Sequence, residues 1–204
     1  MVRLGSRGSR LALIQAELAA DALRSVYPDV DVAIVPMTTA GDRDRSKPFG
    51  EIGERGVFVK EIEEALLAGR IDAAVHSAKD MTSTNTSGLA VGAYLPREDT
   101  RDALCGAEGL RPGMRIGTAS VRRRAELLFL EPSLSVEPLR GNVDTRLRKM
   151  GERGLDAIVL SAAGLDRLGL GGEIGYRFSP EELLPEAGQG AVAEDLDEAL
   201  LLGE

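Results

Sequence analysis

Apolar side chains recur at intervals of three and four residues near the start of the chain. They are Leu11, Ile14, Leu18, Ala22 and Val26. This spacing predicts an amphipathic helix over residues 11–26, which Tyr27-Pro28 would end. Residues 30–37 (VDVAIVPM) are short, apolar and β-branched, and a Gly-rich, charged stretch follows them. The sequence therefore predicts a strand that leads into a long loop.

A second helix and a second strand follow this loop. Residues 57–70 place Val59, Ile62 and Leu66 on one face, with Gly69 as a terminator, and so predict a helix. Residues 71–80 (IDAAVHSAKD) begin as a buried strand and then turn polar abruptly. Because functional groups often follow the carboxyl ends of parallel strands, we expect this polar end to belong to a site.

The alternation of strands and helices continues to residue 160. We expect strands near 89–94, 115–118, 134–139 and 156–160, and helices over 120–130 and 142–151. This βαβ order predicts mostly parallel sheets covered by helices on both faces. Residues 95–104 and 183–193 are typical of junctions, so we expect two α/β lobes with a cleft between them.

Composition narrows the classes of function. The 204 residues, 43% of them hydrophobic, suffice for one or two domains. A formal net charge of −8 argues against nucleic acid as the main partner. No apolar run reaches the roughly 18 residues of a membrane span, and the N-terminus lacks a secretory signal, so we expect a cytoplasmic location. One cysteine, Cys105, and one histidine, His76, leave no cluster for a transition metal, and no metal is expected.

Three basic corners occur where a predicted strand passes into a helix. They are residues 6–10 (SRGSR), 117–124 (GTASVRRR) and 139–147 (LRGNVDTRL). The free N–H groups and dipole at a helix start attract anions, and arginine binds carboxylates through two parallel hydrogen bonds. Together with Lys60 and Lys79, the corners predict a cationic site for a small polycarboxylate or phosphate.

Plainer interpretations of these corners stay open. An N-cap serine with solvated arginines explains the first corner, and a solvated basic face explains the second. Arg122, Arg123 and Arg124 nevertheless occupy a first helical turn, where each opposes the helix dipole at a cost of roughly a few tenths of a kcal/mol. A bound anion would offset that cost. No glycine-rich nucleotide motif accompanies the corners, so nucleotide phosphate is the weaker choice.

Acid–base candidates are few. Asp80 follows a buried strand and stands beside Lys79, where its carboxylate can hold a cationic intermediate. His76 lies in the apolar strand and is expected to be a buried histidine with satisfied hydrogen bonds. Cys105, within DALCG, is expected to be a core residue.

Eight blocks of sequence together resemble the porphobilinogen deaminase family, in family order and at about family spacing. They are RLGSRGSRLALIQA, GERGVFVKEIEEALL, IDAAVHSAKD, LPREDTRDAL, IGTASVRRRAELL, LRGNVDTRL, LDAIVLSAAGLDRLG and LLPEAGQGA. The blocks cover nearly the whole chain. VHSxKD, GTxSxRR and LRGNVxTRL in combination make a chance similarity very improbable.

The resemblance implies an α/β fold with two lobes like those of type II periplasmic binding proteins, with mixed, mostly parallel sheets and a cleft between them. Domain 1 would comprise residues 1–96 and 189–204, and domain 2, inserted, residues 97–188. The family's C-terminal third domain, whose cysteine anchors a dipyrromethane cofactor, is expected to be missing. Cys105 matches a core strand instead. Residues 42–56 match a flexible lid, with Arg55 where a lysine is often found.

The resemblance also implies the activity of a hydroxymethylbilane synthase-like transferase. In the family, porphobilinogen loses ammonia and is joined to a pyrrole chain that grows on dipyrromethane. Asp80 matches the catalytic aspartate that contacts pyrrole nitrogens. The positions that match residues holding cofactor and substrate carboxylates are Arg7, Ser9, Lys60, Lys79, Thr118, Ser120, Arg122, Arg123, Arg140, Gly141, Arg146 and Arg167.

Three functions stay open because the cofactor-anchoring domain is expected to be missing. The first is a porphobilinogen deaminase of tetrapyrrole (heme) biosynthesis in a truncated or split form, with the third domain on a separate chain. The second is a non-catalytic two-lobe module that binds a pyrrole or another polycarboxylate. The third is an enzyme of specialised metabolism that couples pyrroles without a covalent primer. None of these functions involves nucleic acid or a membrane. Residues 81–89 (MTSTNTSGL) depart from the family's usual proline-containing turn, so the backbone after Asp80 is expected to differ.

Overall fold

The computed structural model describes residues 1–38 and 59–198. The chain divides into two compact units, Met1–Arg97 with Ala191–Glu204, and Glu98–Gly190. The expected lid over residues 42–56, with Arg55, lies outside the described residues. The domain boundaries expected from the sequence, and the cleft between lobes, stay predictions.

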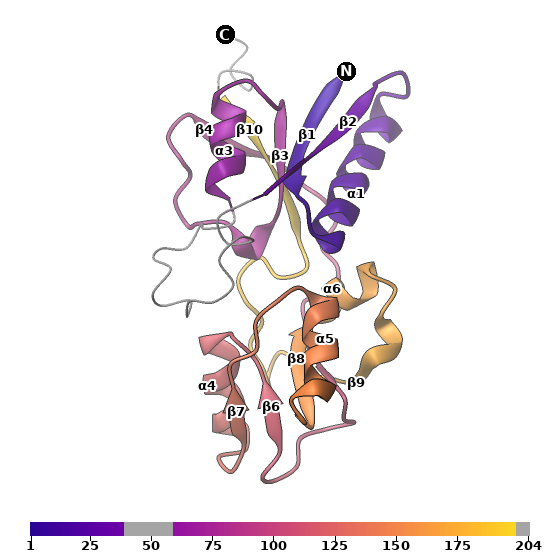
Figure 1. The fold of residues 1–204 in the computed structure, drawn as a ribbon. Coiled ribbons are helices and arrows are strands. Elements are labelled where there is room, and N and C mark those ends of the chain that lie inside the picture. Colours follow the sequence, from indigo (N-terminus) through magenta and orange to yellow (C-terminus); the bar gives the residue numbers. More distant parts are fainter. Residues whose placement is uncertain (39–58, 199–204) are drawn as a thin grey trace. The chain divides into compact units, whose positions relative to one another are not determined.

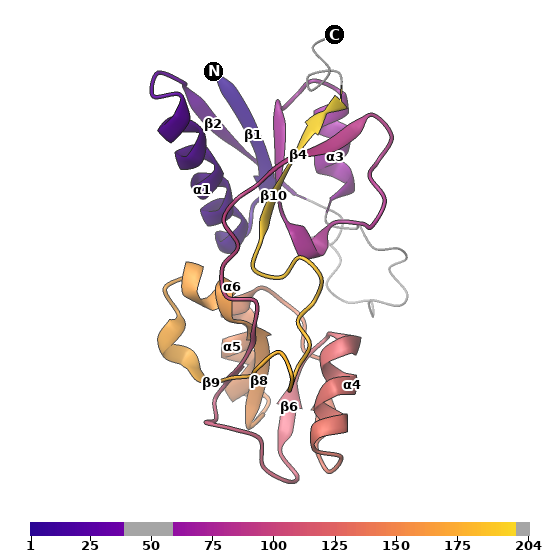
Figure 2. The ribbon, with the colours of Figure 1, turned by 180° about the vertical axis from the view of Figure 1, so that it is seen from behind.

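The first unit is a five-stranded mixed sheet in the order β2-β1-β3-β10-β4 (Figure 1). Its strands are β1 (Val2–Arg7), β2 (Val32–Met37), β3 (Ala73–Ser77), β4 (Leu89–Tyr94) and β10 (Val192–Asp197). β1 runs parallel to β2 and β3, whereas β10 runs antiparallel to β3 and β4 (Figure 2). A strand from the far end of the chain thus completes the sheet.

Helices α1 (Arg10–Val26) and α3 (Lys60–Leu67) cover the faces of the first sheet. The short 3-10 helix η1 (Ala78–Asp80) follows β3. Ala73 and Val75 of β3 pack with the α1 side, whereas Ala74 between them packs with the α3 side. Because successive side chains of a strand point to opposite faces, α1 and α3 lie on opposite sides of the sheet.

The second unit repeats this plan, with strand order β7-β6-β8-β5-β9. Its strands are β5 (Asp102–Cys105), β6 (Arg115–Gly117), β7 (Ser135–Glu137), β8 (Ala157–Ser161) and β9 (Ile174–Arg177). Its helices are α4 (Val121–Leu130), α5 (Val143–Glu152), α6 (Ala162–Arg167) and the short η2 (Gly171–Glu173). β6 is parallel to β7 and β8, and β5 is antiparallel to β8 and β9.

Two apolar clusters fill the second unit, one on each face of its sheet. Val159 packs with Leu127 of α4 and with Phe178, while the adjacent Ile158 packs with Leu147 of α5. The predicted α/β class with mostly parallel, mixed sheets is confirmed. The junctions expected at 95–104 and 183–193 are wrong in part, since they contain β5 and the start of β10.

The segments that enter and leave the second unit, at Glu98 and Gly190, lie next to each other. The backbone N–H of Glu98 donates to the carbonyl of Gly190 at 3.2 Å, and the side chain of Arg167 donates to the same carbonyl at 2.8 Å. Arg167 also forms an ion pair with Glu98 at 3.3 Å. The segments that enter and leave this unit are therefore held side by side.

The backbone of β9 passes close to another segment at Gly175. A Cβ atom at this position would stand against the backbone carbonyl of Ala107, which has no flexible side chain to move aside. We expect Gly175→Ala to lower the free energy of unfolding by about 1–3 kcal/mol, as overpacking does. Urea denaturation measures the change. Gly172→Ala is the control, since its Cβ would meet nothing within 4 Å, and equal losses in both variants would contradict the prediction.

Candidate functional site

The first basic corner lies between β1 and α1. Ser9 is the N-cap of α1, and its side chain accepts a hydrogen bond from the N–H of Ala12 at 3.3 Å. The buried Ser6 hydroxyl donates to the carbonyl of Ala12 at 3.1 Å. Arg7, the last residue of β1, is half-buried beside this capped helix start. The corner therefore has the N-cap serine that the sequence predicts.

The polar end of β3 forms the second corner of this unit. The side chains of Gln15 and Ser77 exchange hydrogen bonds at 2.9 and 3.0 Å, and the Ala78 N–H donates to the Ala191 carbonyl at 3.1 Å. These bonds tie the turn to α1 and to the segment before β10. Lys79 and Asp80, both half-buried, lie within the turn.

Both corners of the first unit lie at the same edge of its sheet. Leu4 and Gly5 of β1 pair in parallel with Ala73 and Ala74 of β3, so the carboxyl ends of these strands are neighbours. Four of the predicted site residues follow those ends: Arg7, Ser9, Lys79 and Asp80. Lys60 instead begins α3, with an exposed side chain whose ammonium lies 3.9 Å from Glu64.

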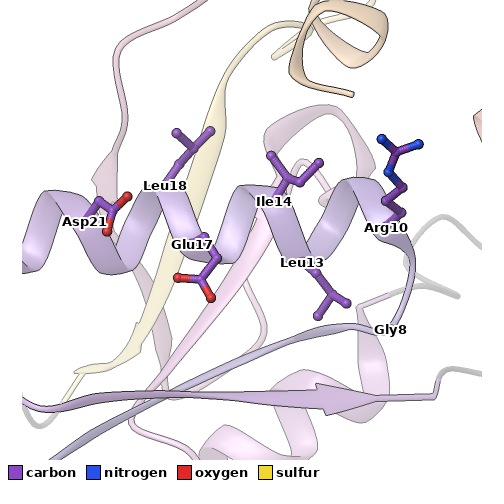
Figure 3. Close-up of a pocket in the computed structure, with 7 residues that line it drawn as sticks. All are labelled: Gly8, Arg10, Leu13, Ile14, Glu17, Leu18 and Asp21. Atoms are coloured by element: carbon purple, nitrogen blue, oxygen red, sulfur yellow. The ribbon is translucent and has the colours of Figure 1, made fainter. Parts of the chain in front are cut away.

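A shallow hollow of about 530 Å³ runs along α1 (Figure 3). Its lining comprises Gly8, Arg10, Leu13, Ile14, Glu17, Leu18 and Asp21. Ile14 and Leu18 point to the same side of the helix in Figure 3. The lining contains two carboxylates and one guanidinium, but none of the predicted site residues. We therefore place the candidate site at the sheet edge and not in this hollow.

The second unit also gathers its predicted residues at one edge. β6 is parallel to β7 and β8, so the segments after these strands are neighbours. Ser120 caps α4, accepting from the Arg123 N–H at 3.3 Å, and its own N–H donates to the buried Thr118 hydroxyl at 3.2 Å. These contacts fix the backbone at the start of α4.

The next corner of this edge follows β7. Gly141 has a φ of 129°, a backbone conformation that favours glycine, and its carbonyl accepts a hydrogen bond from Nε of Arg146 at 2.6 Å. The half-buried Arg140 precedes this glycine, and its carbonyl accepts from Lys149 at 3.1 Å. Arg167 follows β8 on α6 and holds the unit's two connections, as described above.

Two arginines of α4 are neutralised within the protein. The carboxylate of Asp102, fully buried on β5, accepts from Nη2 of Arg122 at 2.7 Å and from Nη2 of Arg123 at 2.6 Å. Gln189 donates to the same carboxylate at 2.8 Å. Burial acts to raise the pKa of Asp102, but Arg123 and Arg122 outweigh it and hold that pKa below its usual value.

This ion cluster changes the interpretation of the second basic corner. From the sequence, a bound anion was one way to offset the cost of arginines at a helix start, whereas in the structure Asp102 provides an anion from the chain itself. The guanidinium of Arg123 is buried and also donates to the Val159 carbonyl at 3.1 Å. Direct binding of ligand carboxylates by Arg122 and Arg123 stays a prediction.

Sequence reasoning missed Asp102 and Gln189. Both belong to stretches that were interpreted as junctions, and neither has a local pattern that indicates its partner. The one signal for Asp102 is an acidic residue at the start of an otherwise apolar run, DALC. Such a residue needs a buried cation, and only the fold shows that α4 provides it.

His76 and Asp195 form a buried pair on the neighbouring strands β3 and β10. Nε2 of His76 lies 3.5 Å from Oδ2 of Asp195, and this nitrogen has no hydrogen bond among the described residues. Burial, with a contribution from Arg7, lowers the pKa of His76 to about 4. Burial, with Glu63, raises the pKa of Asp195 to about 6. The predicted burial of His76 is confirmed, but the prediction of a fully satisfied side chain is wrong.

The described residues also bear on the predictions for Cys105 and for metal ions. Cys105 is fully buried, and burial together with Glu173 raises its thiol pKa to about 11, so its predicted place in the core is confirmed. Within residues 1–38 and 59–198, no group of three or more potential His, Cys, Asp or Glu ligands is close enough to hold a metal ion. None of the described helices is long and apolar enough to cross a membrane.

Removing the charge of Asp102 should cost much stability, because the buried Arg123 would lose its counterion. We expect Asp102→Asn to lower the free energy of unfolding by about 3–5 kcal/mol. Urea denaturation is the measurement. Asp72→Asn, which removes the partly exposed partner of Arg3, is the control and should cost about 1 kcal/mol or less. A loss no larger than that of the control would contradict the structural role of Asp102.

The His76–Asp195 pair predicts two opposite pH dependences. The folded-state pKa of Asp195 lies above its ordinary value of 3.8, so the folded protein holds the extra proton and stability falls as pH rises from about 4 to 6. The folded-state pKa of His76 lies below 6.5, so its contribution rises with pH from about 4 to 6.5.

Substituting either residue should expose the contribution of the other. Relative to the unmodified protein, we expect the free energy of unfolding of Asp195→Asn to rise by about 2–3 kcal/mol as pH increases from 4 to 6.5, because the carboxyl group that loses stability over this range is gone. His76→Gln should show the opposite relative slope. Urea unfolding at several pH values tests both variants, and parallel profiles for all three proteins would show that the pair does not titrate in this range.

Comparison with known proteins identifies relatives over almost the whole chain. The family model for the dipyrromethane cofactor-binding domain of porphobilinogen deaminase matches residues 2–199. A porphobilinogen deaminase of Syntrophotalea carbinolica is 50% identical over 196 residues, which cover 94% of this chain and 62% of that protein. One from Roseiflexus sp. is 49% identical over 194 residues, covering 93% and 64%. The chain thus spans less than two thirds of the length of these relatives.

Solved structures with low sequence identity share the fold. A periplasmic substrate-binding protein of an ABC transporter from Coxiella burnetii has a TM-score of 0.56 and 16% identity, covering 98% of this chain and 86% of that chain. The periplasmic sulfonate-binding protein SsuA from Methylobacillus flagellatus has a TM-score of 0.53 and 12% identity, covering 99% and 62%. These likenesses confirm the predicted periplasmic-binding-protein-like fold. Since the family model extends over residues 2–199, the chain belongs to the porphobilinogen deaminase family.

Proposed function

We propose that this chain forms the part of a porphobilinogen deaminase that binds pyrrole carboxylates and condenses porphobilinogen with loss of ammonia. The proposed activity is that of a hydroxymethylbilane synthase-like transferase in tetrapyrrole biosynthesis. Curated relatives at 50% and 49% identity are named porphobilinogen deaminase. The chain spans only 62–64% of the length of these relatives. The activity that belongs to the whole relatives is therefore proposed for this chain and not carried over as a finding.

One observation carries the proposal: in each unit, parallel pairing brings cationic and hydroxyl side chains to a single sheet edge. Arg7, Ser9 and Lys79 follow the adjacent ends of β1 and β3. Thr118, Ser120 and Arg140 follow the adjacent ends of β6 and β7. Each porphobilinogen ring carries an acetate and a propionate, for which such residues are suitable partners.

Asp80 is the proposed catalytic residue. It lies at the end of η1, in a turn whose backbone is held by the Ala78 N–H, which donates to the Ala191 carbonyl, and by the Met81 N–H, which donates to the Ala78 carbonyl. A carboxylate carried by this turn would stabilise positive charge that develops on a nearby pyrrole nitrogen. Lys79, beside it, would bind a ring carboxylate and keep the ring next to Asp80.

The family model describes a dipyrromethane cofactor-binding domain, and the donor groups of this chain fit that cofactor. Arg140, Arg146 and the hydroxyl groups of Ser9 and Ser120 offer the cationic and hydrogen-bonding partners that its carboxylates need. When bound, dipyrromethane supplies the pyrrole carbon to which new rings are joined. Cys105 is unsuitable as a covalent anchor, because it is fully buried in the second unit and its thiol pKa is raised.

Three further parts of the proposal concern the location of the protein, its substrate and the anchor of its cofactor. We propose a cytoplasmic location and a pyrrole polycarboxylate as the small-molecule substrate. We also propose that a cysteine of a third domain supplies the covalent anchor for the cofactor, whether that domain belongs to the same protein or to a partner chain. Co-purification of a cysteine-containing partner that increases porphobilinogen consumption would support a partner chain.

The test is consumption of porphobilinogen by the purified chain, together with the uroporphyrin formed after oxidation. We expect Asp80→Asn to lower the rate at least about 100-fold, because the charge that stabilises the cationic intermediate is lost. Asp29→Asn, the same change at an exposed acid outside the site, is the control and should keep the rate. Equal rates for both variants would exclude the catalytic role of Asp80, and no consumption by the unmodified chain would count against a stand-alone enzyme.

A further inference from the structure

Arg122 of the second unit has more acidic partners than one guanidinium needs. Nη2 donates to Asp102 at 2.7 Å, and Nη1 donates to Glu126 at 2.8 Å and to the carbonyl of Leu184. Nε donates to Glu186 at 3.3 Å. All of these groups belong to the second unit, so the arrangement does not depend on any other part of the chain.

The charges of this cluster do not favour an added anion. The guanidiniums of Arg122 and Arg123 face the carboxylates of Asp102, Glu126 and Glu186, which is two positive charges against three negative ones. A carboxylate ligand that approaches Arg122 therefore meets a local net charge of −1. Such a ligand binds well only if one of the three acids moves away.

The three carboxylates differ in how firmly they are held. Asp102 is fully buried and also bound by Arg123 and Gln189, so it cannot leave. Glu126 lies one helical turn from Arg122 on α4, and its side chain is 22% exposed. Glu186 makes the longest of these contacts, and its side chain is 39% exposed. Glu186 is therefore the carboxylate that can exchange for a ligand.

We propose that Glu186 is a specificity-determining residue that competes with ligand carboxylates for Arg122. The inference rests on the proposed function and on the prediction from the sequence that Arg122 binds a carboxylate of a pyrrole. The ligand carboxylate takes the position at Nε, and the side chain of Glu186 turns into solvent. No covalent bond changes. The affinity for carboxylate-bearing pyrroles then depends on how much more strongly the ligand carboxylate binds Arg122 than the carboxylate of Glu186 does.

The substitution Glu186→Gln tests this competition. The amide is a weaker partner for Arg122 and removes one negative charge, so we expect porphobilinogen to bind about two- to fivefold more tightly, the range of a partly exposed ion pair. Isothermal titration calorimetry with porphobilinogen gives the Kd. Glu181→Gln is the matched control, because it makes the same charge change at an exposed residue five positions earlier.

A double substitution separates competition from a structural role. In an Arg122→Gln background, Glu186→Gln should change the Kd no more than Glu181→Gln does, because the contested guanidinium is gone. A purely structural Glu186 would instead lower the urea midpoint without tightening binding. Equal Kd values for Glu186→Gln and Glu181→Gln would overturn the inference alone. Absence of porphobilinogen binding in all proteins would overturn the proposed function, and this inference with it.

Discussion

Parallel pairing at the centre of each sheet is the constraint on which the candidate site depends. β1 lies beside β3, and β6 lies between β7 and β8, so the carboxyl ends of these strands emerge together. Residues far apart in sequence, such as Arg7 and Asp80, thereby reach the same edge of the sheet. The apolar residues on both faces of the strands hold this register, because a slip of one residue would turn buried side chains toward the wrong face.

A second feature of the structure is the pairing of arginines with carboxylates of the same chain. The acidic chain concentrates several of its arginines in ion pairs with its own carboxylates, as Arg177 does with Asp99 and Asp166 at 2.7 and 2.8 Å. Arg101 and Arg177 together hold the pKa of Asp99 down to about 2. Arginines in such pairs stabilise the unit. Arg123 has its partners in the core, whereas Arg122 also contacts the partly exposed Glu186.

The fold class was predictable because the signals for it are local. The spacing of Leu11, Ile14 and Leu18 indicates α1, and the apolar run before His76 indicates β3. The pattern of residues missed β5 and β10, because each is a single antiparallel strand next to a connection, where turn-forming residues dominate. Only the family resemblance placed Cys105 in a strand. The strand ends that carry the candidate residues were likewise visible, since polarity changes abruptly after Ser77 and Gly117.

The contacts between these elements were not predictable from the sequence. Nothing near Asp102 indicates that two arginines about 20 residues later will enclose it, and nothing near His76 indicates Asp195. Each contact involves an antiparallel strand, β5 for Asp102 and β10 for Asp195, whose position in its sheet depends on the whole chain. A sequence pattern identifies which face of a strand is buried, but the partner of a buried charge depends on tertiary structure.

The paired ends of the second unit have a consequence for how the chain folds. Strand β10 can pair with β3 and β4 only when the two ends of the intervening segment, Glu98 and Gly190, are brought close together. As an unfolded loop, that excursion would cost on the order of 4 kcal/mol in closure entropy. Once Arg167 and the Glu98 N–H hold the Gly190 carbonyl, the excursion is closed, and the Leu95 N–H lies 3.1 Å from the Val192 carbonyl. The second unit, once folded, thereby acts as a short link between β4 and β10, and the sheet of the first unit can be completed.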